Sequence, residues 1–595
     1  MAIRTLNDLF YSVVERDSER VLLVKRQSEW TPISSRELYR NVVGVARQLE
    51  DWGIGRGDRV AILSENRPEW AVTDFACLTQ GIVTVPVYCT LTAEQTLHIL
   101  RDSGARAIFV STADQLRKIV AIKDDCALEK IVVMDNVSGP DTIAMDRLMT
   151  NGPDSRDEEF DRRALAIDEN TLATIIYTSG TTGTPKGVML TQGNLASNLL
   201  YTASLHDYKS GFISISFLPL SHVLARPVDY AMMWNGVIVA YCRSQEELAP
   251  ALRELKPQVL VAVPRVYEKV HNVVQSKFDS GLKRKLYQWA MNVGHAHKGE
   301  VLAGKMPSAF QWRLADKLLF SKLRAAVGGR LDLAISGAAP LSRAVLDWYA
   351  AIGIRICEGY GLTETSPIVS VSGHKFFSYG SVGRVISTIQ VRIAADGEIL
   401  VKGPSVFKGY WNMPEETDKA FEGEWFHTGD VGRLDDNGFL YITDRKKDLI
   451  KTSGGKFVAP QLLEHKLKSN RLVEEAVIVG DGRNFISAVI APSFPELTKW
   501  AELNHLTFTS REELVASPQV FALFERIVSE VNSGLARFET IKRFVLVAHE
   551  FSIANGALTP TMKLKRRYIE QRFAKQLDEL YAQPVASAFR EDVPA

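Results

Sequence analysis

The sequence predicts an α/β protein with a more antiparallel region and a second, smaller domain near its C-terminal end. Three observations predict this fold class. Short β-branched runs alternate with longer helical patterns through the first two-thirds of the chain. After about residue 380 the pattern changes to short strands separated by Gly and Asp turns. A charged stretch at 444–451 then precedes a fresh α/β pattern.

The alternation in the first part of the chain predicts βαβ units and a largely parallel sheet that is covered on both faces. A helix is expected from Pro68 to Gln80, between two of the predicted strands. The predicted strands are RVAIL (59–63), RAIFV (106–110), KIVVMD (130–135), LATIIYT (172–178), VLVAVP (259–264) and LDLAIS (331–336).

The later part of the chain predicts antiparallel pairing and then a domain boundary. QVRIA, GEILVKG and GFLYITD are short strand candidates with turn residues between them. The charged stretch DRKKDLIK begins at Asp444, where we place the boundary, and VEEAVIVG (473–480) and FISAVIAP (485–492) follow it. The tail after Arg567 is predicted to be a charged helix with a loose end.

Composition excludes several classes of protein. Of the 595 residues, 46% are apolar and 24% are charged, as in globular proteins. A chain of this length is too long to fold around a single hydrophobic core. Lys plus Arg is 71 and Asp plus Glu is 70, and a net charge of +1 argues against a nucleic-acid partner. The five cysteines form no CxxC pair, which favours reduced thiols in the cytoplasm.

No segment predicts export or a membrane span. Charges at Arg4, Asp8, Glu15 and Arg16 interrupt any secretory signal. The longest suggestive uncharged run, Tyr230 to Cys242, is 13 residues long, short of the roughly 18 that a span needs. Peripheral contact with a membrane stays open, and so does the oligomeric state, for which a homodimer is one option.

The stretch YTSGTTGTPKGVMLT (177–191) is the first candidate site. It follows a predicted strand and precedes QGNLASNLL, a predicted helix start, so its glycines and hydroxyls can surround phosphate oxygens while Lys186 supplies charge. A Walker A loop is excluded, because Pro185 stands where Gly is required and Gly187 follows the lysine. Taken alone, a Gly- and Thr-rich stretch of this kind favours a solvated turn with incidental Ser and Thr.

Five further segments carry residues with suitable chemistry. Tyr360 in IRICEGYGLTET (354–365) offers an aromatic face to a base, and Glu364 offers a carboxylate to a hard cation. Asp430 in HTGDVGRLDDNGFLYITDRKKDLIK (427–451) can accept two hydroxyl hydrogens of a sugar. SGAAPL (336–341) and NGALTPTMKLKRRYI (555–569) complete the set, with SGGK at 453–456.

These segments and their order resemble the adenylate-forming superfamily, which includes acyl-CoA synthetases, firefly luciferase and peptide-synthetase adenylation domains. The resemblance spans roughly residues 20 to 570. It implies a large domain, 1–443, of layered parallel sheets with helices and a small barrel-like β region. It also implies a smaller mobile α+β domain, 444–595.

The resemblance implies roles for individual residues. Lys563, Thr363, Glu364 and His222 are the expected catalytic residues, with Mg²⁺ on Glu364 and Thr181. Asp444 is the expected hinge, and Gly454, Gly455 and Lys456 are expected on the coenzyme A side. The expected nucleotide-binding residues are Thr178, Ser179, Gly180, Thr181, Thr182, Gly183, Lys186, Gly337, Ala338, Ala339, Glu358, Gly359, Tyr360, Gly361, Asp430 and Arg445.

The implied reaction has two steps. A carboxylate attacks the α-phosphorus of MgATP to give an acyl-adenylate and pyrophosphate, and the thiol of coenzyme A then displaces AMP. Neither step needs a covalent enzyme intermediate, so the absence of a G-x-S-x-G elbow or an H-E-x-x-H zinc helix is consistent.

FLPLSHVLARPVDY (217–230) and KPQVLVAVPRVYEKV (256–270) resemble the long-chain acyl-CoA synthetase branch, which implies a fatty acid substrate. His222 matches a position near the acyl carboxylate, although a structural role is equally open. Met232, Met233 and Trp234 fit a buried core better than an acyl tunnel. The segment 280–325 predicts two amphipathic basic helices. The resemblance implies that they lie near a membrane or near the acyl entrance. A solvated helical face is an equally open alternative.

Three alternatives remain. A fatty acyl-AMP ligase would pass the acyl group to a carrier protein, but no extra insertion is evident between Thr365 and Gly383. A luciferase-like oxygenase is disfavoured by the long-chain segments. A non-enzymatic nucleotide-binding module would be expected to have lost Lys563 or Glu364, and both are present.

Overall fold

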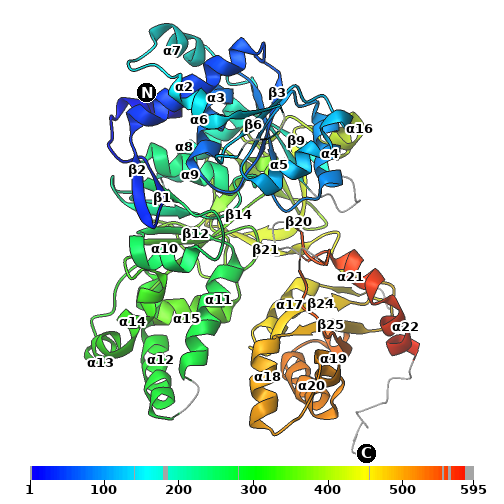
Figure 1. Ribbon diagram of the computed structural model, residues 1–595. Helices are drawn as coiled ribbons and strands as arrows, with labels where there is room; N and C mark the ends of the chain where they lie inside the picture. The colour runs from blue at the N-terminus through cyan, green and yellow to red at the C-terminus, as the bar shows by residue number, and fades with distance from the viewer. Residues whose placement is uncertain are drawn as a thin grey trace, which may run out of the picture. The chain divides into compact units, whose positions relative to one another are not determined.

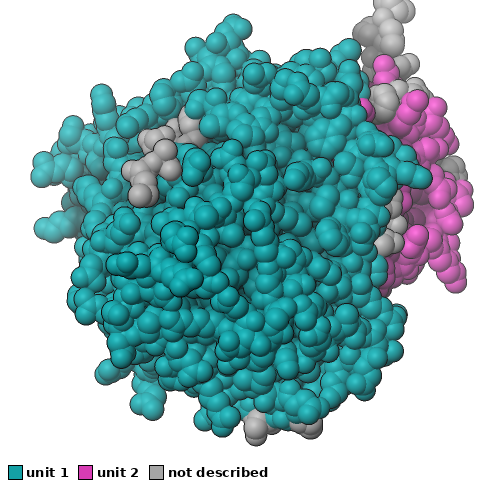
Figure 2. Space-filling model, turned by 90° about the horizontal axis from the view of Figure 1, so that it is seen from above, with its two compact units in different colours: residues 1–428, 433–441 teal, residues 429–432, 442–595 magenta. Residues whose placement is uncertain are grey.

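The computed structural model describes residues 3–582 apart from 138, 140, 179–184, 205, 279–280, 454–455, 553–554 and 560–563. The described chain divides into two compact units (Figures 1 and 2). Unit 1 contains residues 1–428 and 433–441, and unit 2 contains 429–432 and 442–595.

A seven-stranded sheet forms the first layer of unit 1, in the order β7-β6-β5-β3-β4-β8-β9. All neighbours pair in parallel except β8 and β9, which are antiparallel. Its strands are β3 (Arg59–Leu63), β4 (Val83–Val87), β5 (Ala107–Val110), β6 (Lys130–Val133), β7 (Thr142–Ala144), β8 (Leu172–Thr178) and β9 (Lys186–Thr191).

A nine-stranded sheet forms the second layer, in the order β16-β15-β14-β13-β12-β10-β11-β1-β2. Its central strands are parallel, and β2, β15 and β16 are antiparallel to their neighbours. The strands are β1 (Leu22–Arg26), β2 (Glu29–Ile33), β10 (Ile213–Ser216), β11 (Ile238–Tyr241), β12 (Val259–Ala262), β13 (Leu333–Ser336), β14 (Ile356–Gly361), β15 (Ile368–Val371) and β16 (Arg384–Val385).

Helices cover both faces of each large sheet (Figure 1). Alternate strand residues point to opposite faces, so Val60 and Ile62 of β3 join one hydrophobic cluster while Ala61 and Leu63 join another. The first cluster also contains Val259 of β12, and it lies between the two sheets. The inter-sheet cluster includes residues of α1 (Leu6–Glu15), α2 (Ser35–Asp51), α3 (Pro68–Gln80), α8 (Gln192–Ser204) and α9 (Ala225–Trp234).

The remaining helices of unit 1 form two groups, the first at 93–165 together with 414–419 and the second at 248–351. Two helices of the first group, Met145–Thr150 and Glu158–Leu165, also contribute residues to the inter-sheet cluster. Leu260 and Ala262 of β12 pack against helices of the second group, which lie on one side of the nine-stranded sheet in Figure 1. The first group is α4 (Ala93–Ser103), α5 (Ala113–Val120), α6 (Met145–Thr150), α7 (Glu158–Leu165) and α16 (Pro414–Lys419). The second is α10 (Leu248–Leu255), α11 (Pro264–Gln275), α12 (Gly281–Leu302), α13 (Phe310–Ala315), α14 (Ser321–Arg324) and α15 (Arg343–Ala351).

A five-stranded sheet contains the points where the chain passes between the units. Its pairs β17–β18 and β19–β20 are antiparallel, as the turn-rich sequence predicts. The strands are β17 (Gln390–Ile393), β18 (Glu398–Lys402), β19 (Phe421–Glu422), β20 (Trp425–Leu434) and β21 (Leu440–Arg445).

Unit 2 is built on a three-stranded sheet, β24-β25-β26, and a two-stranded sheet, β22-β23. Its strands are β22 (Ile450–Lys451), β23 (Phe457–Val458), β24 (Val473–Val479), β25 (Ile486–Pro492) and β26 (Ile541–Leu546). Its helices are α17 (Pro460–Lys468), α18 (Phe494–Leu503), α19 (Arg511–Ala516), α20 (Pro518–Asn532), α21 (Arg566–Arg572) and α22 (Ala574–Ala582).

The predicted α/β fold class is confirmed, and so are many element positions. The strands at 59–63 and 172–178 and the helix at 68–80 have the predicted bounds. Pro68 begins that helix, and Gly81, in the left-handed conformation, ends it. Among the residues that the structure describes, no helix is long and apolar enough to cross a membrane.

Candidate active site

The stretch 177–191 follows the predicted strand and precedes a helix, α8, as expected, but its second half is a strand, β9, rather than part of a loop. Lys186 to Thr191 form β9, which pairs with β8 so that Thr178 lies opposite Lys186. The Thr178 hydroxyl donates to the Lys186 carbonyl over 3.5 Å. The predicted phosphate-binding residues Ser179, Gly180, Thr181, Thr182 and Gly183 lie outside the described residues.

Lys186 is held beside an aromatic ring and a carboxylate. Its Nζ lies 2.5 Å from Glu416 Oε2 and 4.9 Å from the centre of the Tyr410 ring. The hydrogen bond from Lys186 lowers the pKa of the Glu416 carboxyl to about 2. The sequence analysis did not identify Glu416 or Tyr410, because neither belongs to a recognisable motif.

Backbone pairing with β9 brings Tyr410 to this place. Trp411 N–H donates to the Gly187 carbonyl over 2.7 Å, and Met189 N–H donates to the Gly409 carbonyl over 3.1 Å. Gly187 permits the close approach, since a Cβ there would lie 2.8 Å from Ile175 and 3.1 Å from Trp411.

Tyr410 also contacts Glu364. The Tyr410 hydroxyl donates to Glu364 Oε1 over 3.0 Å, and Phe407 N–H donates to the Glu364 carbonyl over 2.8 Å. Burial, reinforced by the neighbouring Glu364, raises the pKa of the Tyr410 phenol, so the hydroxyl remains a donor at neutral pH. Lys186, the predicted phosphate-binding lysine, and Glu364, the predicted metal ligand, therefore both contact the side chain of Tyr410.

The turn that contains Thr363 and Glu364 follows β14 directly and is fixed from two sides. Asn198 of α8 donates to the Ile368 carbonyl over 2.7 Å, and Leu362 N–H donates to the Pro367 carbonyl over 3.0 Å. Thr363 is buried. Gly361 is required here, because a Cβ would lie 1.8 Å from the Pro367 carbonyl oxygen.

The predicted adenine segments meet at the carboxyl ends of adjacent parallel strands, β13 and β14. Gly337 N–H donates to the Ala262 carbonyl over 3.2 Å, and a Cβ on Gly337 would lie 3.7 Å from the Gly359 carbonyl oxygen. Ala338 has a positive φ of 70°, and Ala339 is exposed.

Glu358 and Tyr360 lie on β14 beside this segment. Burial raises the pKa of the Glu358 carboxyl to about 7, although a hydrogen bond from the Leu341 N–H and the charge of Arg343 act in the opposite direction. Tyr360 is partly exposed and pairs through its backbone with Ser370.

His222 lies in the turn between β10 and α9. Its Nδ1 accepts a hydrogen bond from Leu224 N–H over 3.1 Å. A Cβ on Gly337 would lie 3.6 Å from Leu224, so the His222 turn adjoins the predicted adenine segment. Leu224, two residues after His222, thus lies beside Gly337 in unit 1.

Two residues of the other sheet layer anchor the His222 turn, and the sequence analysis missed both. Asn66, just after β3, donates to the Leu218 carbonyl over 2.7 Å and accepts from Leu220 N–H over 3.2 Å. Asp74 of α3 accepts two hydrogen bonds from Arg226 of α9, at 2.6 and 2.9 Å. An arginine inside the apolar run 217–230 was the available signal for a buried ion pair.

Asp74 and Arg226 are fully buried and belong to a larger polar cluster. Their side chains are 0% and 1% exposed. The Tyr230 hydroxyl donates to Asp74, and the guanidinium lies 5.7 Å from the centre of the Trp70 ring. Since charges are rarely buried unless paired, this cluster fixes α9, and with it the His222 turn, against α3.

Unit 2 contains the predicted ribose pair and the predicted hinge. Arg445 Nε lies 3.0 Å from Asp430 Oδ1; Asp430 is 4% exposed and Arg445 45%. Asp444 is buried and accepts from Arg445 N–H over 2.6 Å. Burial raises the pKa of the Asp444 carboxyl to about 7. Lys456 is exposed, while Gly454, Gly455 and Lys563 lie outside the described residues.

The donor chemistry of the site fits magnesium held mainly by phosphates. Among the described residues, no three His, Cys, Asp or Glu side chains gather into a metal cluster. Mg²⁺ in nucleotide sites is commonly held by one or two carboxylates together with substrate phosphates and water. Glu364, oriented by the Tyr410 hydroxyl, supplies such a carboxylate.

This set of strand-end residues is that of a nucleotide-binding enzyme, and comparisons with known proteins define its class. The model of the AMP-binding enzyme family matches residues 10–411, and that of the AMP-binding enzyme C-terminal domain matches 447–584. The chain belongs to the AMP-binding enzyme family, which confirms the predicted superfamily.

Its relatives include long-chain-fatty-acid–CoA ligases. The chain is 37% identical over 589 residues to "Long-chain-fatty-acid--CoA ligase FadD15" of Mycobacterium bovis, covering 95% of each chain. It is 31% identical to "Long chain acyl-CoA synthetase 7, peroxisomal" of Arabidopsis thaliana, covering 98% of this chain and 87% of the relative. The predicted branch is supported by these relatives.

Solved structures share the fold. A crystal structure of the anthranilate CoA ligase AuaEII in complex with anthranoyl-AMP matches with a TM-score of 0.74 and 18% identity, covering 98% of this chain and 99% of that one. A Mycobacterium tuberculosis fatty acyl CoA synthetase matches with a TM-score of 0.62 and 22% identity, covering 96% and 99%.

Proposed function

We propose that this protein is a long-chain-fatty-acid–CoA ligase that forms AMP. In the first step a fatty acid carboxylate attacks the α-phosphorus of ATP, the bond to the β-phosphate breaks, and pyrophosphate leaves. In the second step the thiol of coenzyme A attacks the acyl carbon, loses its proton, and AMP leaves. The named relatives support the substrates, and the site supports the first step.

The observation that carries this proposal is the arrangement of Lys186, Tyr410 and Glu364 at strand ends of unit 1. A lysine and a carboxylate that share one tyrosine can bind the phosphates of a nucleotide and the cation that accompanies them. Such positioning of charge is the main way in which phosphoryl-group reactions are accelerated.

Lys186 has a partner that nucleotide binding would replace. In the present structure Glu416 neutralises its ammonium group. We infer that the β- and γ-phosphates of ATP, bound by Thr178 and the 179–183 residues, draw Lys186 away from Glu416. The exposed position of Glu416, 38% accessible, lets water take over its solvation at little cost.

Glu364 is the proposed ligand of Mg²⁺, together with Thr181. When bound, the cation would offset the negative charge of the phosphates. Tyr410 holds the Glu364 carboxylate in place through its hydroxyl. Thr363, buried beside it, is proposed to approach a phosphate.

The other side chains bind the rest of the substrates. Gly337 to Ala339 and Glu358 to Gly361 are proposed to enclose the adenine, and His222, held on the same side, to face the acyl carboxylate. In unit 2, Asp430 and Arg445 are proposed to bind the ribose. Lys563 is proposed to bind the reacting carboxylate and α-phosphate, with Asp444 as the hinge and the 454–456 segment on the coenzyme A side.

A panel assay tests the proposal. Pyrophosphate and AMP release are measured with acetate, benzoate, octanoate and palmitate, with and without coenzyme A. We expect the highest kcat/KM with long-chain acids and acyl-CoA formation only when coenzyme A is present. A preference for acetate or benzoate would refute the long-chain assignment, and accumulation of adenylate regardless of coenzyme A would favour a fatty acyl-AMP ligase.

The Lys563→Ala variant separates the two steps. We expect it to abolish acyl-adenylate formation, because the ammonium group offsets charge only at the α-phosphate. Coenzyme A transfer from chemically prepared acyl-adenylate should remain largely intact. Single-turnover assays of each half-reaction measure this, and an equal loss in both would contradict the assigned role of Lys563.

A further inference from the structure

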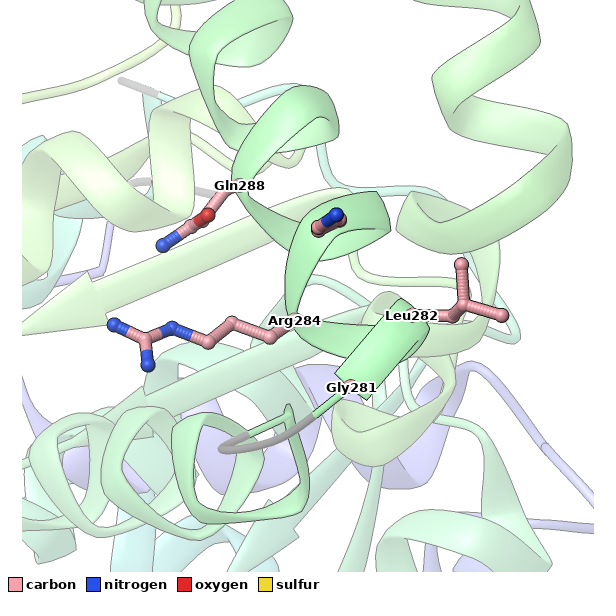
Figure 3. Close-up of a pocket in the computed structure, with 5 residues that line it drawn as sticks. Gly281, Leu282, Arg284 and Gln288 are labelled. Atoms are coloured by element: carbon pink, nitrogen blue, oxygen red, sulfur yellow. The ribbon is translucent and has the colours of Figure 1, made fainter.

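The open pocket at the start of α12 does not have the lining of a specific site. Gly281, Leu282, Arg284, Lys285 and Gln288 line it, so all of its walls come from one helix. In Figure 3 Leu282 points to one side of α12, while Arg284 and Gln288 point to the other. The pocket therefore lacks the convergent polar groups of a binding site.

Asp102, next to the C-terminal end of α4, receives hydrogen bonds from two distant segments of unit 1. Its carboxylate Oδ2 accepts from the Tyr177 hydroxyl over 2.5 Å. Its backbone carbonyl accepts from Trp411 Nε1 over 2.9 Å and from Asn412 Nδ2 over 3.3 Å. One residue of α4 therefore joins β8 to the segment that follows Tyr410.

The electrostatics of α4 alone does not favour an aspartate at this position. The C-terminal end of a helix has a partial negative charge, which cations stabilise and anions do not. The partner of the carboxylate is buried, since Tyr177 is 4% exposed. Burial and the hydrogen bond to Asp102 raise the pKa of the Tyr177 phenol, so the hydroxyl remains a donor. The contact with Tyr177, rather than the helix, therefore accounts for the carboxylate of Asp102.

Tyr177, Gly187 and Trp411 lie side by side on three adjacent chain segments, and we call them the back row. Tyr177 lies opposite Gly187 in the pairing of β8 with β9. Trp411 N–H donates to the Gly187 carbonyl over 2.7 Å. A Cβ on Gly187 would lie 3.3 Å from the Tyr177 ring and 3.1 Å from Trp411. Asp102 bonds to both ends of this row, so it closes a ring of contacts that spans β9.

Each residue of the back row is next in sequence to one residue of the candidate site, and these three residues form the site row. Successive residues of a strand point to opposite faces, so the two rows lie on opposite faces of the segments that they share. The members of the site row are Thr178, Lys186 and Tyr410.

The packing of the side chains agrees with this alternation. Tyr177 and Trp411 pack with the hydrophobic cluster that includes Leu100 of α4. Tyr410 packs with the inter-sheet cluster, on the other face of the seven-stranded sheet. Lys186 Nζ lies over the Tyr410 ring, 4.9 Å from its centre. A displacement of the back row would therefore move the site row.

We propose that Asp102 is a positioning residue for the part of the site that binds the β- and γ-phosphates. It holds Tyr177 and Trp411 at a fixed separation across Gly187, and it thereby sets the spacing of the site row. Asp102 does not contact the nucleotide and acts only through the back row. The inference rests on the proposed function, which supplies the nucleotide.

Nucleotide binding without turnover tests this role. A fluorescent ATP analogue with Mg²⁺ is titrated into the full-length protein in the absence of fatty acid and coenzyme A. We expect Asp102→Ala to raise the Kd about tenfold, because a small displacement of binding groups weakens contacts that depend on placement. Asp102→Asn should stay within about twofold of the wild type, since its amide oxygen still accepts from Tyr177.

Asp51 supplies the matched control. It is the exposed last residue of α2, so it also places an anion at the C-terminal end of a helix of unit 1. Asp51→Ala should bind the analogue like the wild type. A loss shared by Asp51→Ala and Asp102→Ala would assign the effect to the helix ends and overturn the role of the back row.

A double-mutant cycle tests the route through Tyr177. Tyr177→Phe removes only the hydroxyl that donates to Asp102. In that background Asp102→Ala should change the Kd little further, because the contact is already absent. Additive losses in the double variant would show that Asp102 does not act through Tyr177.

Kinetics separate positioning from a general loss of structure. Asp102→Ala should raise the KM for ATP about tenfold. The KM for palmitate and the rate of coenzyme A transfer from prepared acyl-adenylate should equal those of the wild type, because neither involves the β- and γ-phosphates. A parallel loss in all three quantities would indicate damage to the whole of unit 1 and contradict the proposal.

The binding assay distinguishes failure of this inference from failure of the proposed function. An unchanged Kd in Asp102→Ala, or an equal loss in Asp102→Asn, would overturn the role of Asp102 whichever acid the enzyme uses. Nucleotide binding without acyl-CoA formation from any acid would instead refute the proposed function and leave the role of Asp102 standing. Absence of nucleotide binding by the wild type would overturn both.

Discussion

At the scale of single residues, Tyr410 is the side chain that organises the candidate site. Its ring lies beneath the Lys186 ammonium group, and its hydroxyl donates to the Glu364 carboxylate. A cation over an aromatic face and a hydroxyl on a carboxylate are both favourable contacts, so one residue orients two opposite charges. Neither contact follows from motif spacing.

The first prediction concerns Lys186. We expect Lys186→Ala to lower kcat/KM for ATP about a hundredfold, because the β- and γ-phosphates lose a charge partner in a preorganised site. The KM for the fatty acid should change little. Steady-state kinetics with each substrate varied in turn measure both effects.

Lys419 supplies the matched control for this variant. It also pairs with Glu416, at 3.1 Å, but its own side chain is 67% exposed. Lys419→Ala should therefore retain near wild-type kcat/KM for ATP. If Lys419→Ala lost as much activity as Lys186→Ala, the effect would belong to Glu416 and α16 rather than to phosphate binding.

The second prediction concerns the hydroxyl of Tyr410. Tyr410→Phe keeps the ring beneath Lys186 but removes the hydrogen bond to Glu364. We expect the Mg²⁺ concentration for half-maximal activity to rise about tenfold, as is typical when a residue that orients a metal ligand is lost. Activity titrated with Mg²⁺ at saturating ATP measures this, and an unchanged midpoint with a lower plateau would contradict it.

At the scale of elements, the buried parallel strands were predictable. They are continuous apolar runs between turn residues, and β3 and β8 have the predicted bounds. The strand β9 was missed because 186–191 begins with Lys-Gly and lies in a segment that was interpreted as a loop. Its pairing with β8 on one side and with 409–411 on the other determines the strand.

The parts of the site that the sequence did not predict depend on contacts between distant elements. Asn66 and Asp74 are ordinary polar residues of the first sheet layer, and only the fold places them against 218–226 of the second. Gly361 and Glu364 were predicted as site residues because they occur together in one short motif, and their roles stay predictions. The anchors of that segment, Asn198 and Tyr410, were not.

The third prediction tests the Asp74–Arg226 pair as the link between α3 and α9. Arg226→Met leaves a fully buried carboxylate without its cation, which should destabilise unit 1 by about 3–5 kcal/mol. The double variant Asp74→Leu, Arg226→Met removes both charges and should recover most of that loss. Urea unfolding followed by tryptophan fluorescence measures the stability.

Tryptophan fluorescence suits this experiment because nine of the ten tryptophans belong to unit 1. Equal destabilisation in the single and double variants would show that Asp74 and Arg226 do not act as a pair. The surface pair of Lys25 and Glu254, at 2.8 Å, is the control, and Lys25→Met should cost less than about 1 kcal/mol.

At the scale of the whole molecule, the chain divides the proposed substrate contacts between two units. Lys186, Glu364 and His222 belong to unit 1, and Asp430, Asp444 and Arg445 belong to unit 2. The two units can be monitored separately, because Trp500 is the only tryptophan of unit 2. Fluorine-labelled tryptophan therefore gives one resonance for unit 2, which Trp500→Phe assigns.

The environment of Asp444 predicts how the stability of unit 2 depends on pH. Burial, together with the nearby Asp448 and Glu464, raises the pKa of this carboxyl from 3.8 to about 7, although the hydrogen bond from Arg445 N–H and the charge of Arg566 act in the opposite direction. Between these two pH values the folded state keeps a proton that the unfolded state releases. Its contribution to the free energy of unfolding therefore falls as pH rises, by at most about 1.4 kcal/mol per pH unit.

The Asp444→Asn variant cannot titrate at this position, so it isolates the contribution of the carboxyl. We expect the wild type to lose stability relative to Asp444→Asn as pH rises from 5 to about 7, and the difference to level off above that range. The urea midpoint of the Trp500 resonance measures it at each pH. Asp578→Asn, at a 62% exposed position of unit 2, should show no such divergence from the wild type. A difference between wild type and Asp444→Asn that stays flat, or that grows toward acid pH, would show that the buried carboxyl is already ionised in the folded unit.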